Sequence, residues 1–185
     1  MIEEILSEAR NRMQSSLSVF SETLHGIRGN RASTALVDRL AVEYYGQETE
    51  LRQLSNISTP EPMQILIRPY DKEAIRAIEK AIQLSDLGIH PNVEAEAIRL
   101  NMPPLTQERR QQLVKHLHRR TEDARVAIRN IRRSANEDLK EFQREKLISE
   151  DEQKLGQDEV QKLTDQFIEK MDALSRAKEA DIMEL

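Results

Sequence analysis

Arginine is the residue type in this sequence whose number and spacing suggest a chemical role. Residues 105–135 contain nine Lys and Arg against three acidic residues, a net charge of +6, although the whole chain of 185 residues carries −5. Eight of the nine are arginine, whose planar guanidinium donates paired hydrogen bonds to phosphate and stacks on bases. This segment therefore predicts an anion-binding surface, whereas residues 147–185, with a net charge of −6, predict a surface that repels anions.

The spacing of five basic residues gathers them on one side of a predicted helix, within an arc of about 100° at about 100° per residue. They are Lys115, Arg125, Arg129, Arg132 and Arg133. Glu122 interrupts this arc and is expected to pair with an arginine three residues on. An ordinary solvated helix face would show the same pattern and stays an alternative. Because no aromatic residue is interleaved, the arc favours structured RNA read through its backbone over a single-strand stacking platform.

The other chemistry-bearing residues form no catalytic or metal-binding pattern. His116 and His118 lie two apart on the same predicted helix and point about 200° apart, so they cannot share a metal ion. The five glycines form no phosphate-cradling loop, and no nucleophile stands at a characteristic spacing from a base. With no cysteine, disulfides and thiol catalysis are excluded, which fits a reducing cytoplasm. We expect no enzyme, no metal and no cofactor.

Three long helices must position the basic surface. Apolar residues recur every three to four residues from Ile2 to Ile27, and again from Leu113 to Phe142. The residues at 149–152, Ser-Glu-Asp-Glu, form a capping box that begins a third helix with an apolar stripe from Val160 to Ala177. Because a single stripe cannot be buried alone, we expect an antiparallel bundle of the three helices.

The segment between the first two helices has a different pattern, with short apolar or alternating runs separated by Gly and Pro. It predicts strands at 40–45, 51–57 and 63–68, a helix capped by Asp71 and ending before Gly88, and one or two short strands within 93–100. Connections this short favour antiparallel pairing in a small α+β unit. Tyr44, Tyr45, Arg68 and Asp71 are its one crowded polar set, with packing the favoured role for the tyrosines.

The fold class that follows is α+β with two domains. Residues 1–30 and 105–185 form the predicted bundle, residues 31–104 form the inserted unit, and hinges are expected near 29–34 and 101–105. Two chain segments that connect the domains restrict twisting of one domain against the other and allow hinging. The predicted hinge residues are Gly29, Asn30, Ser33, Thr34, Asn101, Pro103 and Pro104.

Several stretches of the chain resemble the bacterial ribosome recycling factors, in the family's order and spacing and from end to end. They include VEYYG at 42–46, LRQL at 51–54, SDLG at 85–88, PPLT at 103–106, ERR at 108–110, ARVAIRNIRR at 124–133, ISEDE at 148–152 and QKLTD at 161–165. The chain departs from the family at Thr34, where a proline is usual, at Gly29-Asn30, and at Ser134, where an aspartate is usual.

The resemblance implies an L-shaped molecule, with a long antiparallel three-helix bundle and an inserted β/α/β domain. It implies a non-catalytic cytoplasmic factor that binds rRNA of the large ribosomal subunit after termination and splits the complex with elongation factor G and GTP. Residues matching Arg129 and Arg132 are central to the rRNA contact in this family. We extend the expected rRNA-binding set to Arg133, Arg125, Arg110, Arg28, Arg31 and Lys115.

Two other function classes remain to be weighed. A coiled-coil-like adaptor would use the same stripes and charges for protein partners only, and would show little salt-dependent affinity for rRNA. An enzyme would need convergent polar groups in the inserted unit. We expect a monomer with no membrane contact.

Overall fold

The computed structural model describes residues 1–184, which form two compact units. The bundle unit comprises residues 1–24 and 114–180, and the sheet unit comprises residues 25–113 and 181–184. These divisions lie a few residues further into the long helices than the limits of 30 and 105 expected from the sequence. The terminal turns of two helices belong to the sheet unit because Arg110 and Asp181 contact its connecting segments.

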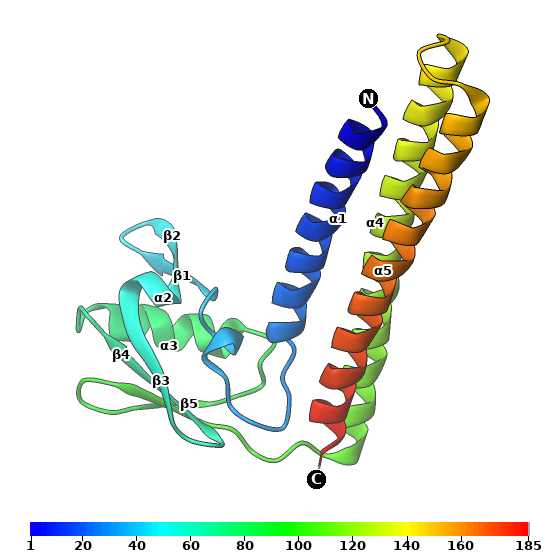
Figure 1. The fold of residues 1–185 in the computed structure, drawn as a ribbon. Helices are drawn as coiled ribbons and strands as arrows, with labels where there is room; N and C mark the ends of the chain where they lie inside the picture. The colour runs from blue at the N-terminus through cyan, green and yellow to red at the C-terminus, as the bar shows by residue number, and fades with distance from the viewer. Residues whose placement is uncertain (185) are drawn as a thin grey trace. The chain divides into compact units, whose positions relative to one another are not determined.

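The bundle is built from three helices, α1 (Ile2–His25), α4 (Gln107–Arg144) and α5 (Glu150–Met183). Their apolar stripes are buried as the 3–4 spacing predicts, from Met13 and Phe20 of α1 to Ile128 and Leu139 of α4. Figure 1 shows α4 and α5 running side by side in opposite directions. Arg12 of α1 donates to Ser134 of α4 at 3.4 Å.

The stripe of α5 departs from its predicted course near the C-terminus of the helix. Leu174 is exposed, and Ser175 is buried in its place, with its hydroxyl 2.8 Å from the hydroxyl of Thr121 on α4. Gly156 brings α5 close to its neighbours, since a Cβ there would lie 3.0 Å from a Leu139 methyl group and 3.5 Å from Ile2. Small and polar residues thus let these helices approach closely.

Two helices begin as the sequence predicts. The hydroxyl of Thr106 accepts from the backbone N–H of Arg109 at the start of α4. The capping box before α5 is confirmed, because Glu152 accepts from the backbone N–H of Ser149 at 2.8 Å and the Ser149 hydroxyl accepts from that of Glu152 at 3.3 Å. These bonds satisfy donors that a helix start leaves free.

The sheet unit contains two antiparallel sheets, and its strand order shows no parallel pair. A hairpin joins β1 (Ala41–Tyr44) to β2 (Gln47–Glu50), and a second sheet has the order β3-β4-β6-β5. The strands of the second sheet are β3 (Ser55–Glu61), β4 (Gln64–Pro69), β5 (Pro91–Val93) and β6 (Ile98–Asn101). Tyr45 and Gly46 both have positive φ, which is the backbone of a two-residue hairpin turn with the twist that flanking strands need.

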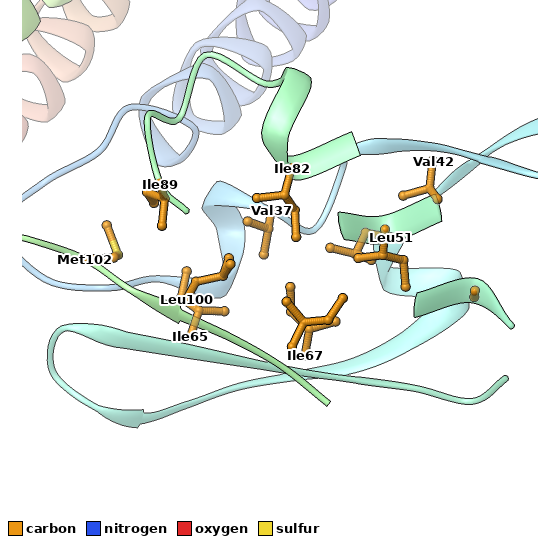
Figure 2. Close-up of a cluster of buried hydrophobic side chains, with 12 residues drawn as sticks. Val37, Val42, Leu51, Ile65, Ile67, Ile82, Ile89, Leu100 and Met102 are labelled. Atoms are coloured by element: carbon orange, nitrogen blue, oxygen red, sulfur yellow. The ribbon is translucent and has the colours of Figure 1, made fainter. Parts of the chain in front are cut away.

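The core of the sheet unit lies between the four-stranded sheet and α3 (Ala74–Leu84), as Figure 2 shows. Ile65 and Ile67 of β4 face this core with Leu100 and Ile98, their partners across the strand pair. Ile78 and Ile82 of α3 complete it from the helix side. Alternate residues of two paired strands therefore present one apolar face to the helix.

Three details of the sheet unit differ from the sequence-based expectation. The strand predicted over 51–57 is wrong, because Leu51–Leu54 form the short helix α2 and β3 begins at Ser55. Helix α3 ends at Leu84 with Ser85 as its C-cap, four residues before Gly88. Asp71 does not cap α3 directly; its carboxylate accepts from the backbone N–H of Glu73, the residue at the cap position.

Candidate nucleic-acid interface

Four arginines of α4 leave the helix beside its buried stripe in the bundle unit. Ile128 and Ile131 are buried between them, so packing fixes the rotation of this part of α4. The arginines at 125, 129 and 132 are partly buried, and Arg133 is exposed. This placement keeps the stems against the protein and the guanidinium groups at its surface. The four differ in which acceptor holds the guanidinium.

Arg125 is held by an ion pair between two helices. Its Nε and Nη2 donate to Oδ1 of Asp172 on α5 at 2.9 and 2.7 Å, and Nη1 donates to Glu122 at 3.3 Å. Hydrogen bonding to Asp172 raises the pKa of the Arg125 guanidinium above its ordinary value. Arg125 therefore links α4 to α5, and most of its donors are occupied.

Arg129 shares Glu122 with Arg125. Its Nη2 donates to Oε1 of Glu122, two turns earlier on the same helix. The hydrogen bonds from Arg129 and Arg125 lower the pKa of the Glu122 carboxyl, so this group stays ionised. The predicted pairing of Glu122 with an arginine three residues on is confirmed, and a second arginine joins it. An anion that binds Arg129 has to compete with Glu122.

Arg132 has a neutral partner. Its Nη1 donates at 3.1 Å to Oε1 of Gln161 on α5, and the Gln161 amide donates to Asp165 at 2.8 Å. The sequence does not single out Gln161, because an uncharged glutamine on a solvated helix gives no signal by itself. The amide supports the guanidinium without cancelling its charge.

The outer members of the basic surface are solvent-exposed. Arg133 donates at 3.4 Å to the side chain of Asn130 on its own helix, and Lys115 is exposed one turn before Arg119. Arg119 and Arg120, which lie outside the predicted basic arc of the helix, are exposed as well. We call the surface formed by Lys115, Arg129, Arg132 and Arg133 the basic face of α4.

Arg110 does not belong to the basic face, which corrects the prediction from sequence. Its side chain is only 5% exposed, and it donates to the backbone carbonyls of Leu105, Ile182 and Glu184. Arg110 thus satisfies carbonyls at and just beyond the C-terminal end of α5, a structural role that leaves no free edge for a phosphate. The sequence cannot reveal this role, because the carbonyls lie more than 70 residues further along the chain.

The other two predicted rRNA-binding arginines lie in the sheet unit. Arg28 donates to the carbonyl of Pro103, so it joins the two segments that connect the helices to the inserted unit. Burial, with Arg109 nearby, lowers the pKa of the Arg28 guanidinium below its ordinary value. Arg31 is exposed. Of these two, Arg31 is exposed and Arg28 is partly buried.

The predicted hinge residues all lie in the sheet unit, and most are held by defined contacts. Gly29 is buried where a Cβ would come within 1.9 Å of the Asp181 carboxylate. Asn30 accepts from Arg110 at 3.4 Å, and Asn101 accepts from Gln64 at 2.9 Å. Ser33 caps the short 3-10 helix Thr34–Leu36, and Pro103 and Pro104 are exposed.

Three members of the crowded polar set of the sheet unit are held by hydrogen bonds, and the fourth, Arg68, is exposed. The Tyr44 hydroxyl donates to Asp71 and the Tyr45 hydroxyl donates to Glu73 at 2.9 Å. The bond to Asp71 raises the pKa of Tyr44 to about 12. Each phenol is thus held protonated against a carboxylate, which ties the β1–β2 hairpin to the start of α3.

Residues 1–184 contain no group of three or more His, Cys, Asp and Glu side chains placed to hold a metal ion. Of the helices in this range, none combines the length and hydropathy that crossing a membrane requires.

Comparison with known proteins places the chain in a family. A sequence model described as ribosome recycling factor matches residues 20–183. The chain belongs to the ribosome recycling factor family. The ribosome-recycling factor of Carboxydothermus hydrogenoformans is 52% identical over 185 residues, and that of Symbiobacterium thermophilum is 49% identical, each with 100% of both chains covered.

Solved structures of ribosome recycling factors are similar to this chain as well. A solution structure of the ribosome recycling factor is 44% identical, covers 100% of this chain and 98% of its own, and has a TM-score of 0.78. A second match, also 44% identical, comes from models of the Thermus thermophilus ribosome recycling factor and Escherichia coli elongation factor G bound to the E. coli post-termination complex. It covers 99% of each chain with a TM-score of 0.69. The two-domain α+β class expected from the sequence is confirmed by this family.

Proposed function

We propose that this ribosome recycling factor binds the large ribosomal subunit of the post-termination complex and, with elongation factor G and GTP, splits the ribosome into its subunits. The proposal extends to this chain the assembly described for the T. thermophilus factor, with which it shares its fold class. The factor acts mechanically and as a monomer in the cytoplasm, and it supplies no catalytic group of its own.

The observation that carries the proposed mode of binding is the basic face of α4. It combines Arg132, whose guanidinium is held by a neutral amide, with Arg129, Arg133 and Lys115 along one helix. Phosphates of folded rRNA offer acceptors at intervals along a backbone, and arginine forks match them in a bidentate way. The acidic residues of 147–185 keep other parts of the bundle from competing for the same polyanion.

The proposal is tested by measuring two activities of one preparation. Splitting of post-termination ribosomes is followed by light scattering with elongation factor G and GTP, and binding to large subunits is measured by co-sedimentation at two salt concentrations. We expect splitting that requires all three components, and affinity that falls steeply with salt, because each phosphate contact contributes nearly one unit to the salt slope. No splitting, or affinity that is insensitive to salt, would contradict the proposal.

A protein-only adaptor is the alternative function class. Its protein partners would bind the charged surfaces that the bundle leaves exposed, and its affinity for purified rRNA would be low at any salt concentration. The co-sedimentation experiment therefore separates the two functions directly.

A further inference from the structure

We infer that Gln161 is a positioning residue, which holds the Arg132 guanidinium ready for a phosphate while leaving its positive charge uncompensated. The inference rests on the proposed rRNA contact of Arg132 and adds a residue from α5 to the binding surface. The hydrogen bond from Arg132 Nη1 to Gln161 Oε1, at 3.1 Å, runs from α4 to α5.

Asp165 determines which end of the Gln161 amide faces Arg132. The amide Nε2 donates to Oδ1 of Asp165 at 2.8 Å, one turn further along α5. A carboxylate can only accept and a guanidinium can only donate, so an amide between them satisfies both in one orientation. That orientation points Oε1 at the arginine. Gln161 also separates Arg132 from the negative charge of Asp165.

Arg132 differs from two neighbouring arginines in that no carboxylate of residues 1–184 pairs with its guanidinium. Glu159 and Lys162, which flank Gln161 on α5, pair with each other at 2.6 Å. Arg125 and Arg129, in contrast, donate to carboxylates. A phosphate that binds Arg132 therefore displaces no carboxylate, and a guanidinium already held by a second helix loses less side-chain freedom on binding.

The test replaces the amide by a carboxylate of the same shape. Gln161→Glu places a negative charge against Arg132, and we expect affinity for purified bacterial large subunits to fall about tenfold, the effect of one charge-assisted hydrogen bond. The salt slope of that affinity should fall by about one unit, as for the loss of one phosphate contact. Gln161→Met keeps the volume and removes the acceptor, so a smaller loss of affinity is expected without a change of net charge.

Two controls separate positioning from a general charge effect. Gln166→Glu adds the same charge at an exposed site on α5, about 140° around the helix, and should leave affinity within about twofold of the unmodified chain. In an Arg132→Ala background, Gln161→Glu should cause no further loss, because the residue acts through Arg132. Melting temperatures of all variants are measured alongside, since Gln161 is exposed and its replacement should not unfold the bundle.

Different results would overturn the role of Gln161 and the proposed rRNA contact of Arg132. Equal losses for the Glu variants at 161 and 166, a Gln161→Glu loss that persists without Arg132, or full affinity in either Gln161 variant would overturn the positioning role. If Arg132→Ala itself binds with unchanged affinity, the proposed rRNA contact of Arg132 fails and the role of Gln161 fails with it.

Discussion

Arg125 and Arg132 lie seven residues apart on α4, so two helical turns separate side chains that leave the helix in nearly the same direction. Arg125 gives most of its donors to Asp172 and Glu122, whereas Arg132 donates to a neutral amide. The same residue type therefore has two kinds of partner on one side of α4: a carboxylate that joins the helices, and a neutral amide that leaves the charge available for the proposed rRNA contact.

Arg132→Ala should leave folding nearly intact and weaken ribosome binding. Its guanidinium makes no ion pair with residues 1–184, and a charge at the protein surface contributes little to stability. Affinity for large subunits should fall with the salt slope reduced by about one unit, and Arg132→Lys should restore only part of it because lysine lacks the bidentate fork. The melt and the titration are measured on the same samples. A lowered melting temperature with a binding loss that follows the unfolded fraction would mark Arg132 as structural.

Arg125→Ala should show the opposite pattern. Removing it breaks the pair with Asp172 between α4 and α5, and the free energy of unfolding should fall by about 1 kcal/mol. Thermal melts give the change, and Asp172→Asn serves as the partner variant. If Arg125→Ala melts like the unmodified chain and loses ribosome affinity, Arg125 contacts RNA and the ion pair contributes nothing to stability.

At the residue scale, the sequence predicts which side of α4 is basic but not which arginines are free. Helix periodicity places Arg125, Arg129 and Arg132 together, and the structure agrees. Their acceptors come from Glu122 on the same helix and from residues 29 to 47 positions away on α5. The role of Arg110 cannot be predicted from the sequence either, because its acceptors are the carbonyls of residues 182 and 184, far along the chain.

The start of α5 is an element whose stability depends on two side chains. In Ser149→Ala the hydroxyl that accepts from the N–H of Glu152 is lost, and the free energy of unfolding should fall by about 1 kcal/mol. Chemical denaturation followed by circular dichroism measures the change. Ser149→Asp, which keeps an acceptor at the cap, is the matched control, and equal destabilisation in both variants would place the helix start elsewhere.

The same capping box gives a pH dependence. The hydrogen bonds from Ser149 lower the pKa of Glu152, so the folded state favours the ionised carboxylate. Its contribution to stability is present above the unfolded pKa of about 4.3 and is lost as the pH falls through the lowered folded value. The difference in melting temperature between the unmodified chain and Glu152→Gln should therefore shrink as the pH is lowered from 7 towards 3. A difference that stays constant would contradict this assignment.

Among the elements, the sequence predicts the secondary structure of long periodic segments better than that of short ones. The helices of the bundle and the capping box follow from spacing that extends over many turns. The apolar run at 51–57 predicts a strand, but Leu51–Leu54 form a helical turn, because so short a run fits either the helix or the strand period. The spacing of apolar residues also does not predict that Ser175 is buried in α5. Its hydroxyl is buried because it forms a hydrogen bond with Thr121 on α4.

At the scale of the molecule, the chain crosses between its two units three times, at residues 24–25, 113–114 and 180–181. We predict that the helices of the bundle and the strands with α3 reorient as near-rigid bodies about the non-helical segments at 29–34 and 101–105, since α4 and α5 run unbroken through the crossings at 113–114 and 180–181. Residual dipolar couplings measured for each unit should then give two different alignment tensors. A single tensor that fits both units under several alignment conditions would show that they are fixed.

The bundle unit is made from segments that 89 intervening residues separate, and this has a consequence for the order of folding during synthesis. Helix α1 leaves the ribosome first, but Met13 and Phe20 have no stripe to pack against until α4 and α5 have been made. The strands and α3 of the sheet unit are complete by Asn101 and pair locally, so we expect them to fold before α1 has packed against the other helices. A nascent chain halted once residue 101 has emerged, with α4 still inside the ribosome, should therefore show protease-resistant strands and α3 behind a cleavable N-terminal segment. The basic face of α4, which we propose contacts rRNA, is then among the last parts of each new molecule to form.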